Sequence, residues 1–251
     1  IVISDSDVTI SNDNWDYFSM SDSSARITQF NNLDLLNNFV MYERPTAQKL
    51  YDDAINSGSL NVHPRIILNA QKIDEIKENI QTDAEFEKLY DRFMQKAEAK
   101  LKENVTEYEF SDNIRMAKLS AVNIMYLALA WNLTGDERYL EKGWLELKSV
   151  AEFPDYNLAS IIFSGIANEL LAIGYDWLYN GLSEQRREFI ENALFNKALK
   201  PLADGYYGRI FARGDDWSTL KWASNMNAVA NTGAICASAA LFDKYPDYCL
   251  D

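Results

Sequence analysis

The sequence predicts an all-α protein built from helical hairpins, and three observations lead to that prediction. Only 10 Gly and 5 Pro occur in 251 residues, too few turn formers for a sandwich or barrel of many short strands. From residue 73 onward, apolar residues recur at three- and four-residue steps, as they do along one face of a helix. A content of 47% hydrophobic and 13% aromatic residues is enough for a substantial core.

Residues 1–60 are the least regular part of the chain. Residues 1–10 alternate apolar and polar side chains like a short strand, and Asp, Ser and Asn are concentrated from 11 to 24. An amphipathic segment follows over 33–55. We therefore expect an irregular N-terminal lead-in over 1–60 and a helical domain over 61–251 that is truncated at its C-terminal end.

The helical domain alternates segments that are apolar on nearly every side with amphipathic ones. The apolar segments are 121–131 and 158–178, the amphipathic ones are 139–153 and 183–199, a Gly- and Tyr-rich loop spans 201–214, and a helix of small residues spans 225–242. A buried helix followed by an amphipathic helix, repeated, is the pattern of an (α/α) toroid. We expect an incomplete toroid; an irregular bundle and an α-solenoid are the alternatives.

Charge and composition exclude several classes of function. The chain has 38 acidic and 24 basic residues, a formal net charge of -14, whereas nucleic acids and anionic membranes require a basic surface. No apolar run approaches the roughly 20 residues that span a bilayer. One His and two Cys, Cys236 and Cys249, cannot form a His-rich metal site, a Ser-His-Asp triad or a disulfide framework. We expect no nucleic-acid or membrane partner, no metal site and no cofactor.

The stretch from residue 204 to 233 combines aromatic, cationic and amide side chains. Aromatic faces stack on sugar rings, Arg and Lys pair with carboxylate or sulfate, and amides hydrogen-bond within partly buried sites. This combination predicts a site for an acidic saccharide; the alternative is a long loop where such residues meet without a ligand. The candidate substrate-binding residues are Tyr206, Tyr207, Arg209, Arg213, Trp217, Lys221, Trp222 and Asn231.

Three amides mark the start of the last helix. Asn231 lies one turn beyond Asn227, on the same face of an otherwise apolar helix, which suggests a polar cavity. Capping of the helix is the alternative role for Asn225.

For four other polar residues the sequence favours structural roles. His63 stands beside a proline in a loop, and Asp176 stands at a helix end, where we expect it to bond backbone amides of the next turn. Asp215 and Asp216 are adjacent and point apart, as in a loop turn.

Three segments in order resemble the heparinase II/III-like polysaccharide lyases and their alginate-lyase relatives. Residues 63–68 read His-Pro-Arg-Ile-Ile-Leu, and residues 174–179 read Gly-Tyr-Asp-Trp-Leu-Tyr before Leu-Ser-Glu at 182–184. Residues 225–233 read Asn-Met-Asn-Ala-Val-Ala-Asn-Thr-Gly and are similar to the family's Asn-rich helix. The resemblance covers roughly residues 60–242.

The resemblance implies an incomplete toroid followed by β-sandwich domains, and β-elimination on a uronate polymer. Asn225 and Asn227 match the family residues that neutralise the uronate carboxylate. Met226 and Ala230 stand where the family has Trp and Cys, which alters packing there. The family's acid and base, a Tyr and a His, are expected beyond residue 251, and we expect none of the family's β-sandwich domains within these residues. We therefore expect half an active site and no activity from this chain alone.

The polymer class implied is a glycosaminoglycan, alginate or another uronate, with a less sulfated one favoured by the negative net charge. A periplasmic or secreted location follows from that substrate class. Two other functions stay open. An inverting hydrolase needs two carboxylates about 6.5–9.5 Å apart, for which Asp176, Asp215 and Asp216 are the candidates. A non-catalytic glycan-binding or scaffold domain needs neither acid nor base.

Overall fold

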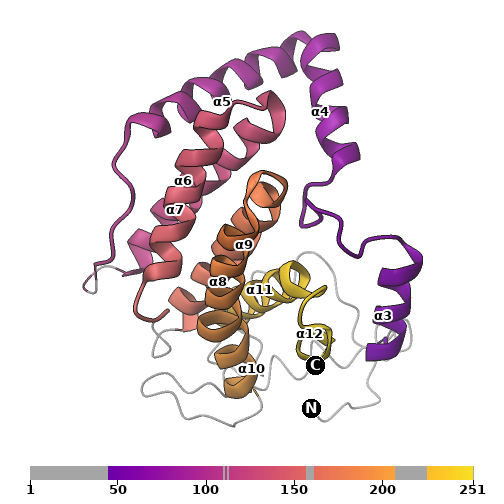
Figure 1. The fold of residues 1–251 in the computed structure, drawn as a ribbon. Coiled ribbons are helices and arrows are strands. Elements are labelled where there is room, and N and C mark those ends of the chain that lie inside the picture. The colour runs from indigo at the N-terminus through magenta and orange to yellow at the C-terminus, as the bar shows by residue number, and fades with distance from the viewer. Residues whose placement is uncertain (1–44, 110, 112, 157–160, 207–224, 251) are drawn as a thin grey trace, which may run out of the picture. The chain divides into compact units, whose positions relative to one another are not determined.

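The computed structural model describes residues 45–109, 111, 113–156, 161–206 and 225–250 (Figure 1). The chain divides into two units, Ile1–Thr46 and Ala47–Asp251, and every described helix lies in the second. The helices are α3 (Ala47–Asn56), α4 (Ala70–Thr82), α5 (Ala84–Lys102), α6 (Asn113–Thr134), α7 (Glu137–Glu152), α8 (Ile161–Leu178), η3 (Tyr179–Gly181), α9 (Glu184–Ala193), η4 (Leu194–Leu199), α10 (Lys200–Tyr206), α11 (Asn225–Leu241) and α12 (Pro246–Leu250). Because these residues contain no strand, the predicted all-α class is confirmed for the described part of the chain.

Side-chain caps set where several helices begin. A capping side chain accepts a hydrogen bond from an otherwise unpaired amide of the first turn and contributes about 1 kcal/mol to stability. The capping residues are Asn69 for α4, Asp83 for α5, Asp136 for α7 and Ser183 for α9. Gly135 precedes the α7 cap with φ of +70°, a conformation that favours glycine and lets the chain reverse between α6 and α7.

Helices α6 and α8 run in the same direction. Gly174 of α8 lies against Ile124 of α6, and later in both helices the Asn132 amide donates to the Trp177 carbonyl at 2.7 Å. Corresponding positions therefore follow one another in the same order along the two helices.

Helices α8 and α11 also run in the same direction. Gly165, near the start of α8, lies against Val229, near the start of α11. Near their ends, Arg65 links the two helices, because its backbone amide donates to Asp176 and its side chain donates to the Ala239 carbonyl at 2.9 Å. We call α6, α8 and α11 the parallel set.

Helices α5, α7 and α9 run against the parallel set. For α7 and α8, Gly143 meets Leu178 and Leu147 meets Gly174, so early residues of one helix pair with late residues of the other. For α9, Glu191 meets Tyr175 of α8, and Arg187 meets Tyr179 of η3. Helix α5 runs in the same direction as α7, because Glu98 contacts Arg138 and the later Glu103 carbonyl accepts from Lys142. Ion pairs between Arg138 and Glu98 and between Arg186 and Glu141 connect α5 to α7 and α7 to α9. We call α5, α7 and α9 the opposing set.

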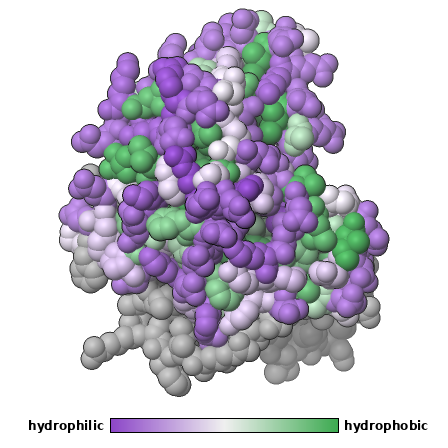
Figure 2. Space-filling model, viewed as in Figure 1, coloured by the Kyte–Doolittle hydropathy of each residue, from purple (hydrophilic) through white to green (hydrophobic). Residues whose placement is uncertain are grey.

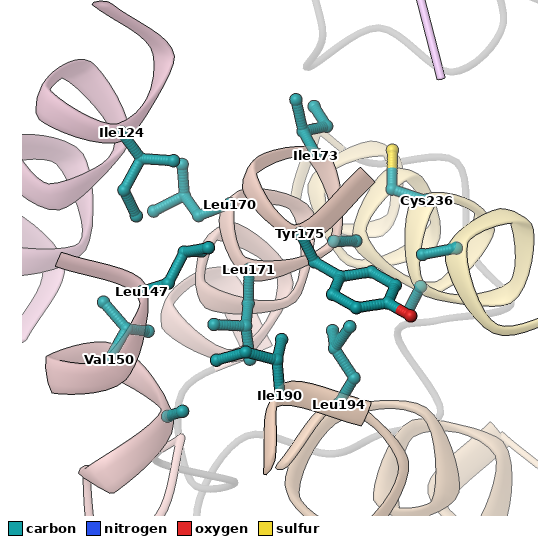
Figure 3. Close-up of a cluster of buried hydrophobic side chains, with 14 of the residues drawn as sticks. Ile124, Leu147, Val150, Leu170, Leu171, Ile173, Tyr175, Ile190, Leu194 and Cys236 are labelled. Carbon is teal, nitrogen blue, oxygen red and sulfur yellow. The ribbon is translucent and has the colours of Figure 1, made fainter. Parts of the chain in front are cut away.

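Helix α8 lies at the centre of the core. Figure 3 shows Leu171 and Tyr175 of α8 facing Ile190 and Leu194, with Leu147 of α7 on another side. These side chains are at most 2% exposed, and each buried aliphatic one contributes roughly 1.5–3 kcal/mol. Helix α8 is buried almost all round, as its sequence predicts, while hydrophilic residues cover most of the viewed surface (Figure 2).

Two boundaries differ from the sequence-based expectation. Helix α3 lies within the stretch 1–60 assigned to the lead-in, yet it belongs to the second unit, where the ring of Tyr51 lies 6.0 Å from that of Phe242. The first part of the predicted loop over 201–214 is helical instead. The π-helical η4 continues directly into α10, which ends at Tyr206. Pro201 lacks an amide hydrogen, and the π-helical bonding of η4 directly before it changes the hydrogen-bond pattern where that donor is missing.

Candidate functional site

The predicted saccharide-binding residues fall at the ends of α10 and α11 and between them. Asn225 and Asn227 lie in the first turn of α11, Asn231 lies one turn further along and is partly buried, and Tyr206 is the last residue of α10. The others lie outside the described residues: Tyr207, Arg209, Arg213, Trp217, Lys221 and Trp222.

Helix α11 is held against α8 by an exceptionally close crossing. A Cβ on Gly165 would lie 2.7 Å from the Val229 carbonyl oxygen and 2.8 Å from the Ala230 Cα, and a Cβ on Gly233 would meet the Gly165 backbone. Only glycine allows backbones to approach this closely. The crossing therefore fixes the start of α11, with its asparagines, beside the start of α8.

Polar side chains are buried without partners near this crossing. Ser164 precedes Gly165, and Asn168 lies one helical turn after Ser164, so the two share a face of α8. Both are 0% exposed. Within the described part of the chain, neither the Ser164 hydroxyl nor either end of the Asn168 amide has a hydrogen-bond partner. Such groups are rare in folded proteins and call for a bound water or ligand.

Asn168 was not among the predicted site residues, although the sequence contains a signal for it. Asn168 interrupts a helix that is otherwise almost entirely apolar, as Asn231 does in α11. The parallel direction of α8 and α11 then places both amide-bearing segments toward the same ends of the two helices. The arrangement provides neutral hydrogen-bonding groups in a region of low dielectric, which suits an anionic oxygen or a sugar hydroxyl.

A second polar cluster lies at the opposite ends of these helices, around the chain's single histidine. The His63 Nδ1 atom lies 2.6 Å from an Asp176 carboxylate oxygen, and its ring stacks on Tyr179 with the centroids 3.9 Å apart. The Asp176 carboxylate also accepts hydrogen bonds from the backbone amides of Arg65 and Ile66. The His63 side chain is 1% exposed and bonded within the protein, which is consistent with a structural role.

The expected partners of Asp176 were wrong in one respect. Asp176 bonds backbone amides, but they belong to the loop before α4 and not to the turn after α8. The amides after Asp176 continue helical bonding into η3, whereas those of Arg65 and Ile66 have no helical partner.

Asp243, in the turn after α11, completes this cluster. One carboxylate oxygen lies 2.7 Å from an Arg65 guanidinium nitrogen and 3.5 Å from His63 Nε2, and the other accepts from the Asn61 amide at 3.0 Å. Hydrogen bonds from His63 and Arg65 outweigh burial and hold the pKa of Asp243 well below its usual range. Asp243 is therefore ionised at neutral pH.

A pocket of about 290 Å³ opens beside His63. Its walls come from the loop before α4, from α8 and α9, and from the turn after α11. Tyr175 donates to Glu191 at 2.6 Å and Lys244 pairs with the same carboxylate, while the Arg187 guanidinium lies over the Tyr179 ring. Most polar groups in this wall bond one another.

The carboxylates of the hydrolase alternative are not assembled in the described residues. Asp176 is 0% exposed and bonded to a ring nitrogen and two backbone amides, so it cannot act on a sugar. Asp215 and Asp216 lie outside the described residues.

Other chemistry has little support in the described part of the chain. No group of three His, Cys, Asp or Glu residues there could hold a metal ion. Cys236 and Cys249 are free thiols, and burial raises their pKa to about 11 and about 12, so both stay protonated at neutral pH. None of the described helices is long and apolar enough to cross a membrane.

Comparison with known proteins gave no match, either to a protein-family model or to a curated protein sequence.

Proposed function

We propose that this chain is the helical part of a polysaccharide lyase that binds a uronic-acid-containing polymer and neutralises its carboxylate. The observation that carries the proposal is the pair of unpartnered buried polar side chains, Ser164 and Asn168, beside the crossing that holds the start of α11. Buried polar groups cost stability unless they are bonded, so their retention suggests a ligand.

The parallel and opposing sets of helices support the proposed fold. We infer that successive hairpins curve into an incomplete (α/α) toroid whose inner layer is α6, α8 and α11. In such a layer the parallel helices all begin at one end, and the amides of α8 and α11 then face a common cleft.

In the proposed reaction, amide groups lower the free energy of the enolate-like state. Asn225 and Asn227 hydrogen-bond the uronate carboxylate, which acidifies the proton at C5. A base removes that proton, a double bond forms between C4 and C5, and an acid protonates the departing C4 oxygen. Aromatic and cationic residues from 206 to 222 bind the neighbouring sugars.

His63 does not supply the acid or base. It is the single histidine in the chain, and both ring nitrogens face carboxylates in a buried cluster. We propose that both the acid and the base, a tyrosine and a histidine in the family that the chain resembles, come from outside these 251 residues. A periplasmic or secreted location would bring the protein to its polymer.

A non-catalytic glycan-binding domain is the second candidate. The same locked histidine favours it, because binding requires the amides and aromatic residues but no acid or base.

Product analysis separates these functions. The protein, as its source makes it, is incubated with alginate, chondroitin and heparan chains, and the products are examined by ultraviolet absorbance and mass. New chains ending in an unsaturated uronate support the lyase. Saturated ends would show hydrolysis instead, and binding without any new ends would leave the glycan-binding domain.

A further inference from the structure

His63 joins three segments that are distant in sequence. The loop before α4 carries the ring, α8 supplies Asp176 on the Nδ1 side, and the turn after α11 supplies Asp243 on the Nε2 side. Tyr179 covers one face of the ring, and Tyr175 meets it edge-on with the centroids 6.1 Å apart.

We propose that His63 is a pH-sensitive latch, whose imidazolium form ties the loop over 61–66 to the C-terminal ends of both α8 and α11. This inference goes beyond the proposed function and does not depend on it. An imidazolium has two N–H donors, one for each carboxylate. A neutral imidazole that donates from Nδ1 to Asp176 turns an unprotonated Nε2 toward Asp243, so two acceptors face each other and the second link is lost.

Deprotonation loosens the latch without breaking the whole cluster. Asp243 keeps its ion pair with Arg65 and its hydrogen bond from the Asn61 amide. Asp176 keeps the backbone amides of Arg65 and Ile66. The expected response to rising pH is therefore a larger open fraction of the loop over 61–66, which these remaining bonds still hold, and not global unfolding.

Charged and titratable groups face His63 from every neighbouring element. They are Arg65 in its own segment, Tyr175, Asp176 and Tyr179 from α8 and η3, Glu184, Arg187, Glu188 and Glu191 across the pocket from α9, and Asp243 and Lys244 after α11. Burial by itself would lower the pKa of His63, but hydrogen bonds to Asp176 and Asp243 raise it above the ordinary 6.5, against the opposing effect of Arg65.

The raised pKa of His63 determines how the stability of the latch changes with pH. A group whose pKa is higher in the folded chain stabilises the fold fully below its unfolded pKa, about 6.5. That contribution disappears as the pH rises through the folded pKa. The latch is thus closed below the unfolded pKa and opens as the pH rises through the folded pKa of His63.

Because the chain has a single histidine, its imidazole can be titrated by NMR without assignment of other rings. We expect a pKa above 6.5 in the wild-type chain and a lower value in Asp243→Asn. The control Glu141→Gln removes a surface carboxylate paired with Arg186, and it leaves the titration of His63 unchanged. A wild-type pKa at or below 6.5, or the same value in Asp243→Asn, overturns the proposal.

Hydrogen exchange then tests whether the loop responds. After correction for intrinsic rates, peptides covering 61–66 should lose protection above the His63 pKa, by about tenfold for each unit by which that pKa is raised. A His63→Gln chain should show no such step, and α7 should stay unchanged in both. The same step in His63→Gln, or a parallel loss in α7, contradicts a local latch.

Discussion

Asn168 is the residue whose environment departs furthest from what a folded protein needs for stability. Both ends of its amide are buried without a partner in the described structure, and each such group costs about 1–3 kcal/mol. A residue retained at that cost is expected to serve binding and not stability.

Replacing Asn168 by Leu should therefore stabilise the chain and weaken binding of a uronate oligosaccharide. We expect the free energy of unfolding to rise by about 1 kcal/mol, because the branched shape and the number of heavy atoms are kept and the unpaired amide is removed. Urea unfolding and calorimetric titration measure the two effects. Asn192→Leu, on the exposed surface of α9, is the matched control and should change neither. A destabilised Asn168→Leu chain with unaltered binding would mean that Asn168 only supports the fold.

Asp176, unlike Asn168, is buried with all its polar contacts made, and each of those contacts stabilises the fold. Asp176→Asn replaces a carboxylate that accepts from His63 and from the amides of Arg65 and Ile66, so we expect a loss of about 3 kcal/mol. Thermal or urea unfolding measures it. The control Glu141→Gln breaks an exposed ion pair and should cost about 0.5 kcal/mol or less. If both variants lost the same free energy of unfolding, burial of the carboxylate would not determine how much it stabilises the fold.

At the residue scale, the sequence predicts the kind of role that a side chain has better than it predicts which residues that side chain contacts. A structural role for His63 follows from the neighbouring proline, but its partners Asp176 and Asp243 come from segments more than 100 residues away. Nothing local in the sequence indicates such pairings, because they depend on how α8 and α11 pack.

At the scale of elements, the crossing of α8 and α11 is the contact that positions the candidate site. Gly165→Ala puts a methyl group 2.7 Å from the Val229 carbonyl oxygen, and neither backbone can yield without moving its helix. We expect a loss of about 2 kcal/mol in unfolding experiments. Ile235→Ala, at a position of α11 that is 68% exposed, should be nearly neutral. If Gly165→Ala were equally neutral, the helices would not be in such close contact.

The spacing of apolar residues predicted which segments form helices, but it did not predict all the residues at which the helices begin and end. The starts of α7 and α9 agree with their Asp136 and Ser183 caps, which are local features of the sequence. The extension of helix past Pro201 escaped prediction because η4 changes the hydrogen-bond pattern just before the proline. Residues 121–131 are apolar on nearly every side, yet not all of these side chains are buried, since Val122 is 45% exposed.

At the scale of the whole molecule, the all-α class could be predicted and the position of the site only in part. Composition and periodicity determine the class, because they reflect how much apolar surface each helix must bury. The site depends on which helix ends meet, and this became visible only through the contacts of Gly165 and Gly233. Most predicted aromatic and cationic site residues, from Tyr207 to Trp222, lie outside the described residues, so their roles remain predictions.

The central claim is that this chain recognises the carboxylate of a uronate, and one binding comparison tests it most directly. Calorimetry compares a uronate oligosaccharide with the same oligosaccharide after its carboxylates are reduced to alcohols. We predict that the chain binds the charged form at least about tenfold more tightly, equivalent to about 1.4 kcal/mol, and that Asn227→Ala removes the difference. Equal affinity for the two sugars, or binding of neither, would contradict the account.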